Sequence, residues 1–318
     1  MINKKYISYF NFFEIQKKKS KKIFEISNLL KNKEKFLDLK PKYNTIFIFG
    51  LPRSGTTFLY DRICNKFEVG YVDNIFARFW KSPLLGAKIS NNLLELENNK
   101  DYLNFYGRTF KLKSPHEFSY FWRHWLKIKN INHYTKFNSK NNVDWKKLAT
   151  IIKNIQYEFK KPIVFKTGFA ANFSSYFEKH FPYPFFIYIK RSPKQVAVSI
   201  LKARIANNKS RKKWWSMFPS NYTEFKKKNY LDQIANQVNQ LNKDYQKAYD
   251  KIDNDKKILI DFSEYVKDPI KIEKKIFNKI KKKYPKTKFD KKKIVFRNPD
   301  IKLSKSEIKK LISKINIT

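Results

Sequence analysis

A polar loop, Gly50-Leu-Pro-Arg-Ser-Gly-Thr-Thr57, has the residue types and spacing of an anion-binding site. It follows the apolar run Thr45–Phe49 and leads into a segment with helical periodicity, so the sequence predicts a strand, a glycine-bounded loop and a helix N-terminus. In that order, backbone N–H groups and the helix dipole converge on an anion. The loop residues expected to contact the anion are Arg53, Ser54, Gly55, Thr56 and Thr57.

The loop departs from the nucleotide triphosphatase pattern G-x-x-x-x-G-K-[ST] at one position. The spacing from Gly50 to Gly55 fits, but Thr56 stands where that pattern requires the lysine that contacts the β- and γ-phosphates. Two later apolar runs end in Lys166 and Arg191 rather than in the acidic residue that holds magnesium in such enzymes. We therefore expect a polyanion held by protein cations without a metal, with a P-loop kinase or NTPase as the alternative enzyme.

A second candidate anion site follows the apolar run 185–189. Arg191 comes at the end of this predicted strand, Pro193 occupies the first position of a predicted helix, and Ser199 lies two turns into it. Ligands of doubly wound sheets bind at the carboxyl ends of strands. Arg191 and Ser199 are thus expected to share a phosphate.

Together the two motifs resemble those of the sulfotransferases that use 3′-phosphoadenosine 5′-phosphosulfate (PAPS). The stretch from Pro52 to Phe58 is similar to that family's 5′-phosphosulfate loop, and Arg191 and Ser199 match its 3′-phosphate clamp. The resemblance implies PAPS as sulfuryl donor, 3′,5′-bisphosphoadenosine as product, and a hydroxyl or amine of a carbohydrate or small metabolite as acceptor. It covers roughly residues 45–277 and leaves the acceptor unidentified.

The catalytic base is expected in the segment Ser114-Pro-His-Glu117. Sulfuryl transfer needs a base near the acceptor, and both His116 and Glu117 have suitable chemistry. The same four residues also fit a capping box that opens a helix, in which Glu117 reaches back to the Ser114 backbone. Asp73 is a third candidate base. Lys166 is expected to contact the ligand or the transition state.

Alternating strands and helices predict a doubly wound, mostly parallel α/β sheet of P-loop type, flanked by helices. Residues 74–159 lack a strong strand and are expected to form a helical insertion between the first and second core strands. Residues 1–43 are expected to be an N-terminal lead-in with a helix over 22–36, followed by a single domain over 44–318.

The composition excludes some classes of protein and argues against others. The single cysteine, Cys64, rules out an internal disulfide, and the N-terminal stretch has no apolar core after its lysines, so we expect a cytoplasmic protein without a membrane span. The net charge of +43 comes mainly from lysine in a sequence that is also rich in Asn, Ile, Phe and Tyr, which indicates compositional bias. A basic nucleic-acid-binding module is therefore the second alternative, and we expect no specific nucleic-acid partner. Contact with an acidic membrane surface is compatible with this charge, and the oligomeric state is not predicted.

Overall fold

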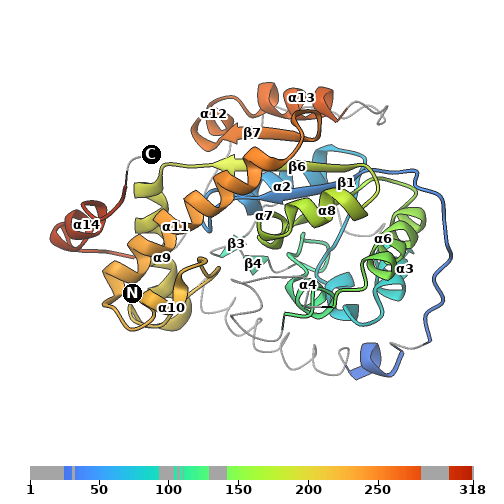
Figure 1. The fold of residues 1–318 in the computed structure, drawn as a ribbon, viewed down its shortest axis with the longest axis horizontal. Coiled ribbons are helices and arrows are strands. Elements are labelled where there is room, and N and C mark those ends of the chain that lie inside the picture. Colours follow the sequence, from blue (N-terminus) through green and yellow to red (C-terminus); the bar gives the residue numbers. More distant parts are fainter. Residues whose placement is uncertain are drawn as a thin grey trace.

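The computed structural model describes residues 25–30, 33–92, 104–105, 108–109, 111–128, 142–280 and 301–316. Its centre is a five-stranded sheet in the order β2-β5-β1-β6-β7, and every neighbouring pair of strands is parallel (Figure 1). The strands are β1 (Thr45–Phe49), β2 (Gly70–Tyr71), β5 (Ile163–Lys166), β6 (Pro184–Lys190) and β7 (Lys257–Asp261). The predicted parallel α/β sheet is confirmed.

Strand β1 is buried along its whole length because it is paired on both sides and covered on both faces. Its side chains alternate between two hydrophobic cores: Phe47 and Phe49 belong to one, whereas Ile46 and Ile48 belong to the other. This alternation explains why the strand reads as a continuous apolar run rather than an amphipathic one.

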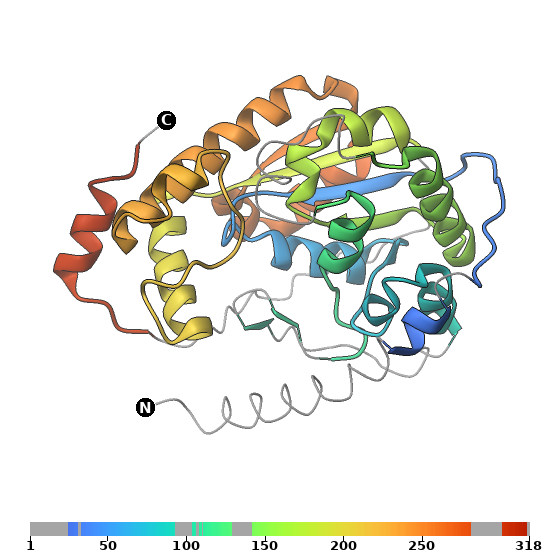
Figure 2. The ribbon, with the colours of Figure 1, turned by 60° about the horizontal axis from the view of Figure 1, so that its bottom comes forward.

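Helices cover both faces of the sheet (Figure 2). The core that contains Ile46 and Ile48 is closed by α2 (Thr56–Lys66) and α13 (Pro269–Lys279). The other core is closed mainly by α4 (Ser119–Trp125), α6 (Trp145–Phe159), α8 (Ser174–His180), α9 (Pro193–Asn208) and α11 (Tyr230–Lys251). The remaining elements are η1 (Phe76–Phe79), α3 (Pro83–Asn92), β3 (Asn104–Phe105), β4 (Arg108–Thr109), α7 (Phe169–Asn172), α10 (Tyr222–Phe225), η3 (Asn254–Lys256), α12 (Phe262–Lys267) and α14 (Lys305–Ile312).

The region between β1 and β5 is more mixed than the helical insertion expected from the sequence. It contains the edge strand β2, which the sequence analysis missed, and an antiparallel pair, β3 and β4, besides α3, α4 and α6. Strand β2 has only two residues, Gly70 and Tyr71, so no alternating pattern marks it.

The predicted capping box at Ser114–Glu117 is wrong. Helix α4 begins later, at Ser119, after Phe118 adopts a left-handed conformation with φ of 57°. The Ser114 N–H donates to the Lys111 carbonyl, and the Glu117 carboxylate accepts from Lys166. The segment therefore approaches the helix as a turn, which leaves Glu117 available to face the sheet edge.

The N-terminal helix is shorter than the range 22–36 expected. Residues 25–30 are helical and residues 34–40 are not, while 22–24 and 31–32 lie outside the described residues. The extended part is fastened to α6, where the Leu37 N–H donates to Asn154 Oδ1 (3.0 Å) and Tyr157 donates to the Lys40 carbonyl (3.0 Å). These long-range bonds hold the non-helical residues that follow the predicted helix against α6. No helix among the described residues has the length and apolar character needed to cross a bilayer.

Candidate active site

The loop from Gly50 to Gly55 leaves the carboxyl end of β1 and turns into α2, as the sequence predicted. Two residues have positive φ: Arg53 at 73° and Gly55 at 102°. A Cβ on Gly55 would lie 2.3 Å from the Phe262 ring, and one on Gly50 would lie 2.5 Å from the Ile189 carbonyl oxygen. The loop therefore packs so closely against the ends of β6 and β7 that both glycines are required sterically.

The start of α2 is built like an anion cradle. Its N-cap is Gly55, which provides no side-chain cap, and its first turn contains no acidic residue. Ser54 is fully buried, and its Oγ has no hydrogen-bond partner among the described residues. An uncapped helix N-terminus beside a buried, unsatisfied hydroxyl fits a bound anionic group.

Arg53, Ser199 and Arg191 come together from two predicted motifs. Arg53 Nε donates to Ser199 Oγ at 3.1 Å, and Arg191 Nη1 donates to the Arg53 carbonyl oxygen at 3.1 Å. Arg191 Nε also donates to Gln195 Oε1 at 3.0 Å. These two hydrogen bonds of Arg191 are with a carbonyl and a carboxamide, and no carboxylate among the described residues forms an ion pair with it. Burial lowers the pKa of Arg191 from its ordinary value.

Phe262 is part of this site, and the sequence analysis did not identify it. The Arg191 guanidinium lies over the Phe262 ring at 4.8 Å from its centroid, and the same ring contacts Gly55. Phe262 is the first residue after β7, a parallel strand ending at the same sheet edge. Its place directly after a parallel strand is the sequence feature that could have identified it. The ring holds Arg191 against the loop by packing and by cation–π attraction.

Lys166, at the end of β5, joins the loop to the candidate base segment. Its Nζ donates to Thr57 Oγ1 at 2.7 Å and forms an ion pair with Glu117 Oε1. The Lys166 side chain is 10% exposed and that of Glu117 is 48% exposed, so the pair lies at the rim of the site. Desolvation raises the pKa of Glu117, but the charge and hydrogen bond of Lys166 outweigh it and leave the pKa below its ordinary value.

His116 is held beside Glu117 in a fixed tautomer. Its backbone N–H donates to the Val72 carbonyl (2.7 Å), and its Nδ1 accepts from the Phe118 N–H (2.9 Å). Burial is the main reason why the pKa of His116 falls to about 4. The Glu117 charge opposes this fall, and the Lys166 charge adds to it. The imidazole is therefore neutral at pH 7, with its proton on Nε2.

Asp73 has a structural position. It is fully buried, its Oδ1 accepts from the N–H groups of Ile75 and Phe76, and its Oδ2 accepts from Ser90 Oγ. Its backbone forms a bridge with Pro115, which fastens the Glu117 segment to the end of β2. Burial raises its pKa. The carboxylate is occupied on both oxygens, which argues against its role as an alternative base.

The described residues contain no group of three or more His, Cys, Asp or Glu side chains placed to hold a metal ion. Three of the predicted site residues, Arg53, Lys166 and Arg191, are cations at the carboxyl edge of the sheet.

Several solved structures and one sequence profile are similar to this chain. Similar solved structures include sulfotransferase STF9 from Mycobacterium avium (11% identity, 88% of this chain and 74% of that one, TM-score 0.49). Sulfotransferase STF1 from Mycobacterium tuberculosis (13% identity, 85% and 71%, TM-score 0.47) and the sulfotransferase domain of the curacin biosynthetic pathway (14% identity, 79% and 77%, TM-score 0.44) are also similar. No curated protein sequence matches this chain. The sequence profile described as "Sulfotransferase family" matches residues 45–285, a stretch that runs from β1 beyond α13, and the chain therefore belongs to the sulfotransferase family.

Proposed function

We propose that this protein transfers a sulfuryl group from PAPS to a hydroxyl or amine of an acceptor, a carbohydrate or another small molecule. The observation that carries the proposal is the hydrogen bond from Arg53 to Ser199. It joins the two anion-binding motifs, which lie far apart in the sequence, into one continuous cationic site. A donor with phosphate at one end and phosphosulfate at the other needs such a site.

Each side chain of the cradle has a role in this proposal. The amides of the loop and the donors of Arg53, Ser54, Thr56 and Thr57 bind the 5′-phosphosulfate. Arg191 and Ser199 bind the 3′-phosphate. Charge-assisted hydrogen bonds of this kind are about twice as strong as neutral ones, and Arg can bind phosphate with two parallel donors.

Glu117 is the favoured base. Neither ring nitrogen of His116 is available to accept a proton from the acceptor. Nδ1 already accepts from the Phe118 N–H, and Nε2 carries the proton of the neutral ring. The Glu117 carboxylate is ionised and about half exposed, so an acceptor can reach it. As the acceptor oxygen or nitrogen bonds to sulfur, the bond from sulfur to the 5′-phosphate oxygen breaks, and the acceptor proton passes to Glu117.

Lys166 acts on both sides of this transfer. Because it contacts Thr57 in the loop and Glu117 at the rim, its ammonium stabilises negative charge as it develops on the sulfuryl and leaving oxygens. The ion pair with Glu117 also orients the carboxylate.

A ligand-binding experiment tests the donor assignment. Differential scanning fluorimetry without magnesium should show stabilisation by 3′,5′-bisphosphoadenosine, since a ligand that binds only the folded state raises Tm. Arg191→Ala and Ser199→Ala should each weaken the bisphosphate but leave the weaker binding of adenosine 5′-phosphosulfate nearly unchanged, because it lacks the 3′-phosphate. We expect about tenfold for Arg191→Ala, the range of a lost charge-assisted contact.

Lys309→Ala, an exposed charge on α14, is the matched control and should bind both nucleotides normally. Stabilisation only by magnesium-ATP would favour the kinase alternative, and stabilisation only by oligonucleotides would favour the nucleic-acid-binding alternative. Incubation with labelled PAPS and a panel of glycans and metabolites then identifies the acceptor.

A further inference from the structure

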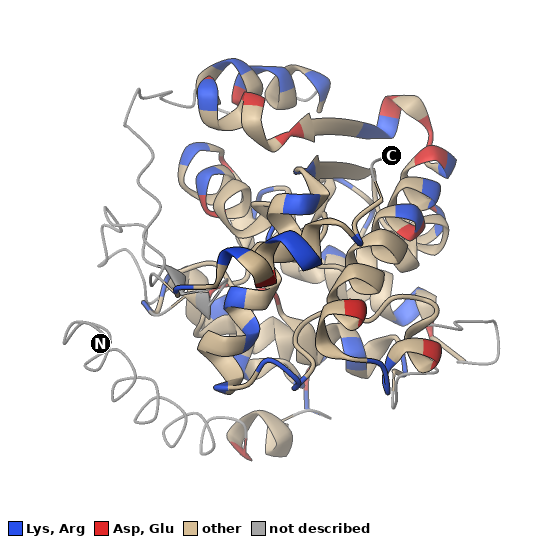
Figure 3. Cartoon of the chain, turned by 90° about the vertical axis from the view of Figure 1, so that its left-hand side faces the viewer, with Lys and Arg blue, Asp and Glu red and all other residues tan. Residues whose placement is uncertain are grey.

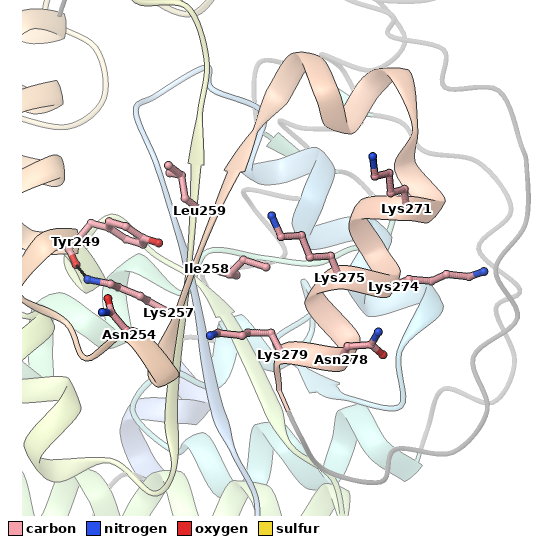
Figure 4. A pocket seen from close by; sticks show the side chains of 10 residues that line it. All are labelled: Tyr249, Asn254, Lys257, Ile258, Leu259, Lys271, Lys274, Lys275, Asn278 and Lys279. Carbon is pink, nitrogen blue, oxygen red and sulfur yellow. Dashed lines mark hydrogen bonds between the residues drawn. The ribbon is translucent and has the colours of Figure 1, made fainter.

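A second cationic surface lies at the amino-terminal half of β7, away from the site at its carboxyl end. Here a groove runs between the end of α11 and α13 with the β7 strand at its floor (Figure 4). Its lining residues are Tyr249, Asn254, Lys257, Ile258, Leu259, Lys271, Lys274, Lys275, Asn278 and Lys279. Five of these are lysines and none is acidic.

The floor of the groove is a sheet edge. Strand β7 is the last in the strand order, and among the described residues no strand pairs with its outer side. Ile258 and Ile260 are buried, but Leu259 between them is 40% exposed. An edge strand of this kind presents backbone N–H and C=O groups to a further strand.

The lysines on the wall are spaced to match an added strand. Lys271, Lys275 and Lys279 follow one another at four-residue intervals on α13, so they lie about 6 Å apart along the helix. Alternate side chains of a β-strand are about 6.6 Å apart and point to the same face. Three successive carboxylates on one face of an extended peptide can therefore each meet one lysine.

Lys257 contributes differently. Its Nζ donates to the carbonyl oxygens of Tyr249 and Asp250, at 2.9 Å and 3.2 Å, where α11 ends (Figure 4). Its charge is thus used to cap a helix and to hold the opposite wall of the groove in place. Four lysines of α13 line the groove, and three of them, Lys271, Lys275 and Lys279, are spaced one turn apart and are the charges expected to select an occupant.

We propose that the outer edge of β7 docks an extended segment of a partner protein that carries Asp or Glu at alternate positions. The strand edge provides main-chain hydrogen bonds, Leu259 provides an apolar contact, and α13 reads the carboxylates. A flexible anionic polymer could neutralise the lysines. Only a polypeptide backbone could also form main-chain hydrogen bonds with the outer edge of β7.

The test uses the full-length protein and a labelled peptide, acetyl-Thr-Glu-Val-Glu-Val-Glu-Thr-amide, followed by fluorescence anisotropy at low salt. We expect saturable binding, and at least fivefold weaker binding of a permuted peptide with its three glutamates contiguous. N-methylation of one alternate set of peptide amides should abolish binding, and methylation of the other set should not, since a strand presents successive amides to opposite sides.

Charge reversal tests the lysines. The triple variant Lys271→Glu, Lys275→Glu, Lys279→Glu should lower peptide affinity about tenfold or more, because each exposed ion pair contributes a factor of about two. The matched control reverses three exposed lysines of α14, at Lys305, Lys309 and Lys310, and should reduce affinity less than threefold.

The proposal would be overturned by equal binding of the permuted peptide, by an equal loss of affinity in the control variant, or by no binding of the alternating peptide. Heparin that binds more tightly than the peptide and is lost in the α13 variant would assign the groove to a polyanion instead. If the α13 variant does not fold, as judged by circular dichroism, the two N-methylated peptides still decide the question on the unaltered protein. None of these measurements depends on sulfuryl transfer.

Discussion

Lys166 contacts both the loop and the candidate base, and its charge acts together with burial on the pKa values of Glu117 and His116. The ammonium favours the ionised form of Glu117 and disfavours the protonated form of His116. Two adjacent residues that looked equivalent in the sequence therefore differ in the structure: one is an anion, and the other is a neutral donor.

Glu117→Gln should lower kcat roughly a hundredfold while leaving 3′,5′-bisphosphoadenosine affinity unchanged, because it removes the base but no donor contact. His116→Asn should lose less than about tenfold, since its Oδ1 can accept from the Phe118 N–H as Nδ1 does. Steady-state kinetics and fluorimetry on the two variants make the comparison. A larger loss in His116→Asn than in Glu117→Gln would reverse the assignment.

The pH dependence follows from the same pKa shifts. A base with a lowered pKa stays ionised until the pH falls below its ordinary value of 4.5, and His116 titrates only at about 4. We therefore expect kcat/KM to be flat from about pH 5.5 to pH 8 and to fall only in more acidic solution. A limb near pH 6.5 in the pH–rate profile would contradict Glu117 as the base.

The sequence correctly predicted that most of the proposed donor-binding residues lie at one edge of the sheet, because their positions depend on local order. A glycine-bounded loop between a strand and a helix fixes where Arg53 and Ser54 lie, and the same logic fixes Arg191. Phe262 and Asp73 could not be assigned in this way. Whether an aromatic ring covers a loop depends on contacts between distant segments. The Asp73 carboxylate is engaged by the nearby Ile75 and Phe76 N–H groups and also by the more distant Ser90 hydroxyl.

At the scale of single elements, short-range patterns failed where distant partners competed with them. The pattern at Ser114–Glu117 satisfies a capping box, but the bridge between Asp73 and Pro115 holds the backbone in another conformation. Helix α14 shows the opposite case, where Ser304 Oγ accepts from the Glu307 N–H as a capping pattern predicts. The Glu307 carboxylate itself accepts from Arg211 Nε and from the Tyr230 hydroxyl, so distant partners engage this side chain while the Ser304 cap is kept.

Glu34 provides a test at this scale, because it fastens the N-terminal segment to the first turn of α3. Its Oε1 accepts from the Leu85 N–H at 2.7 Å, while its Oε2 is buried without a partner among the described residues. Desolvation, only partly offset by the backbone bonds to Leu85 and Leu84, raises the pKa of Glu34 to about 7. A carboxyl with a raised pKa favours folding when protonated, so its contribution is full below about pH 4.5 and is lost as the pH rises through about 7.

Glu34→Gln should therefore gain stability relative to the unaltered protein as the pH increases from about 5 to about 8. The amide oxygen keeps the bond to Leu85 without ever becoming charged. We expect the difference in unfolding free energy to shift by about 1 to 3 kcal/mol in favour of the variant, measured by urea denaturation at both pH values. Glu25→Gln, an exposed carboxylate on the same segment, should show no such shift.

At the scale of the whole molecule, the net charge of +43 acts on the folded state as well as on its partners. Lys and Arg positions occur on many of the helices and loops drawn in Figure 3. A distributed excess of one sign destabilises a compact chain by self-repulsion. Screening this repulsion should help the protein fold.

We expect Tm to rise by several degrees when NaCl increases from about 0.02 M to about 0.5 M, as the Debye length falls from over 20 Å to about 4 Å. Differential scanning calorimetry measures the change. Sucrose at equal osmolality serves as the control for solvent effects that do not depend on charge. A Tm that stays constant or falls with salt would mean that exposed ion pairs such as Lys161–Glu68, which salt also screens, outweigh the repulsion.

The strand order has a consequence for how the protein is made. Thr45 in β1 pairs with Ile163 on one side and with Pro184 on the other, and Phe262 closes over Gly55 only after β7 has joined the sheet. A nascent chain on the ribosome therefore contains the loop from Gly50 to Gly55 long before it contains the later strands against which the loop packs. Such non-local pairing is slow to form. Chains truncated before β7 should emerge with the loop sequence intact and no nucleotide affinity.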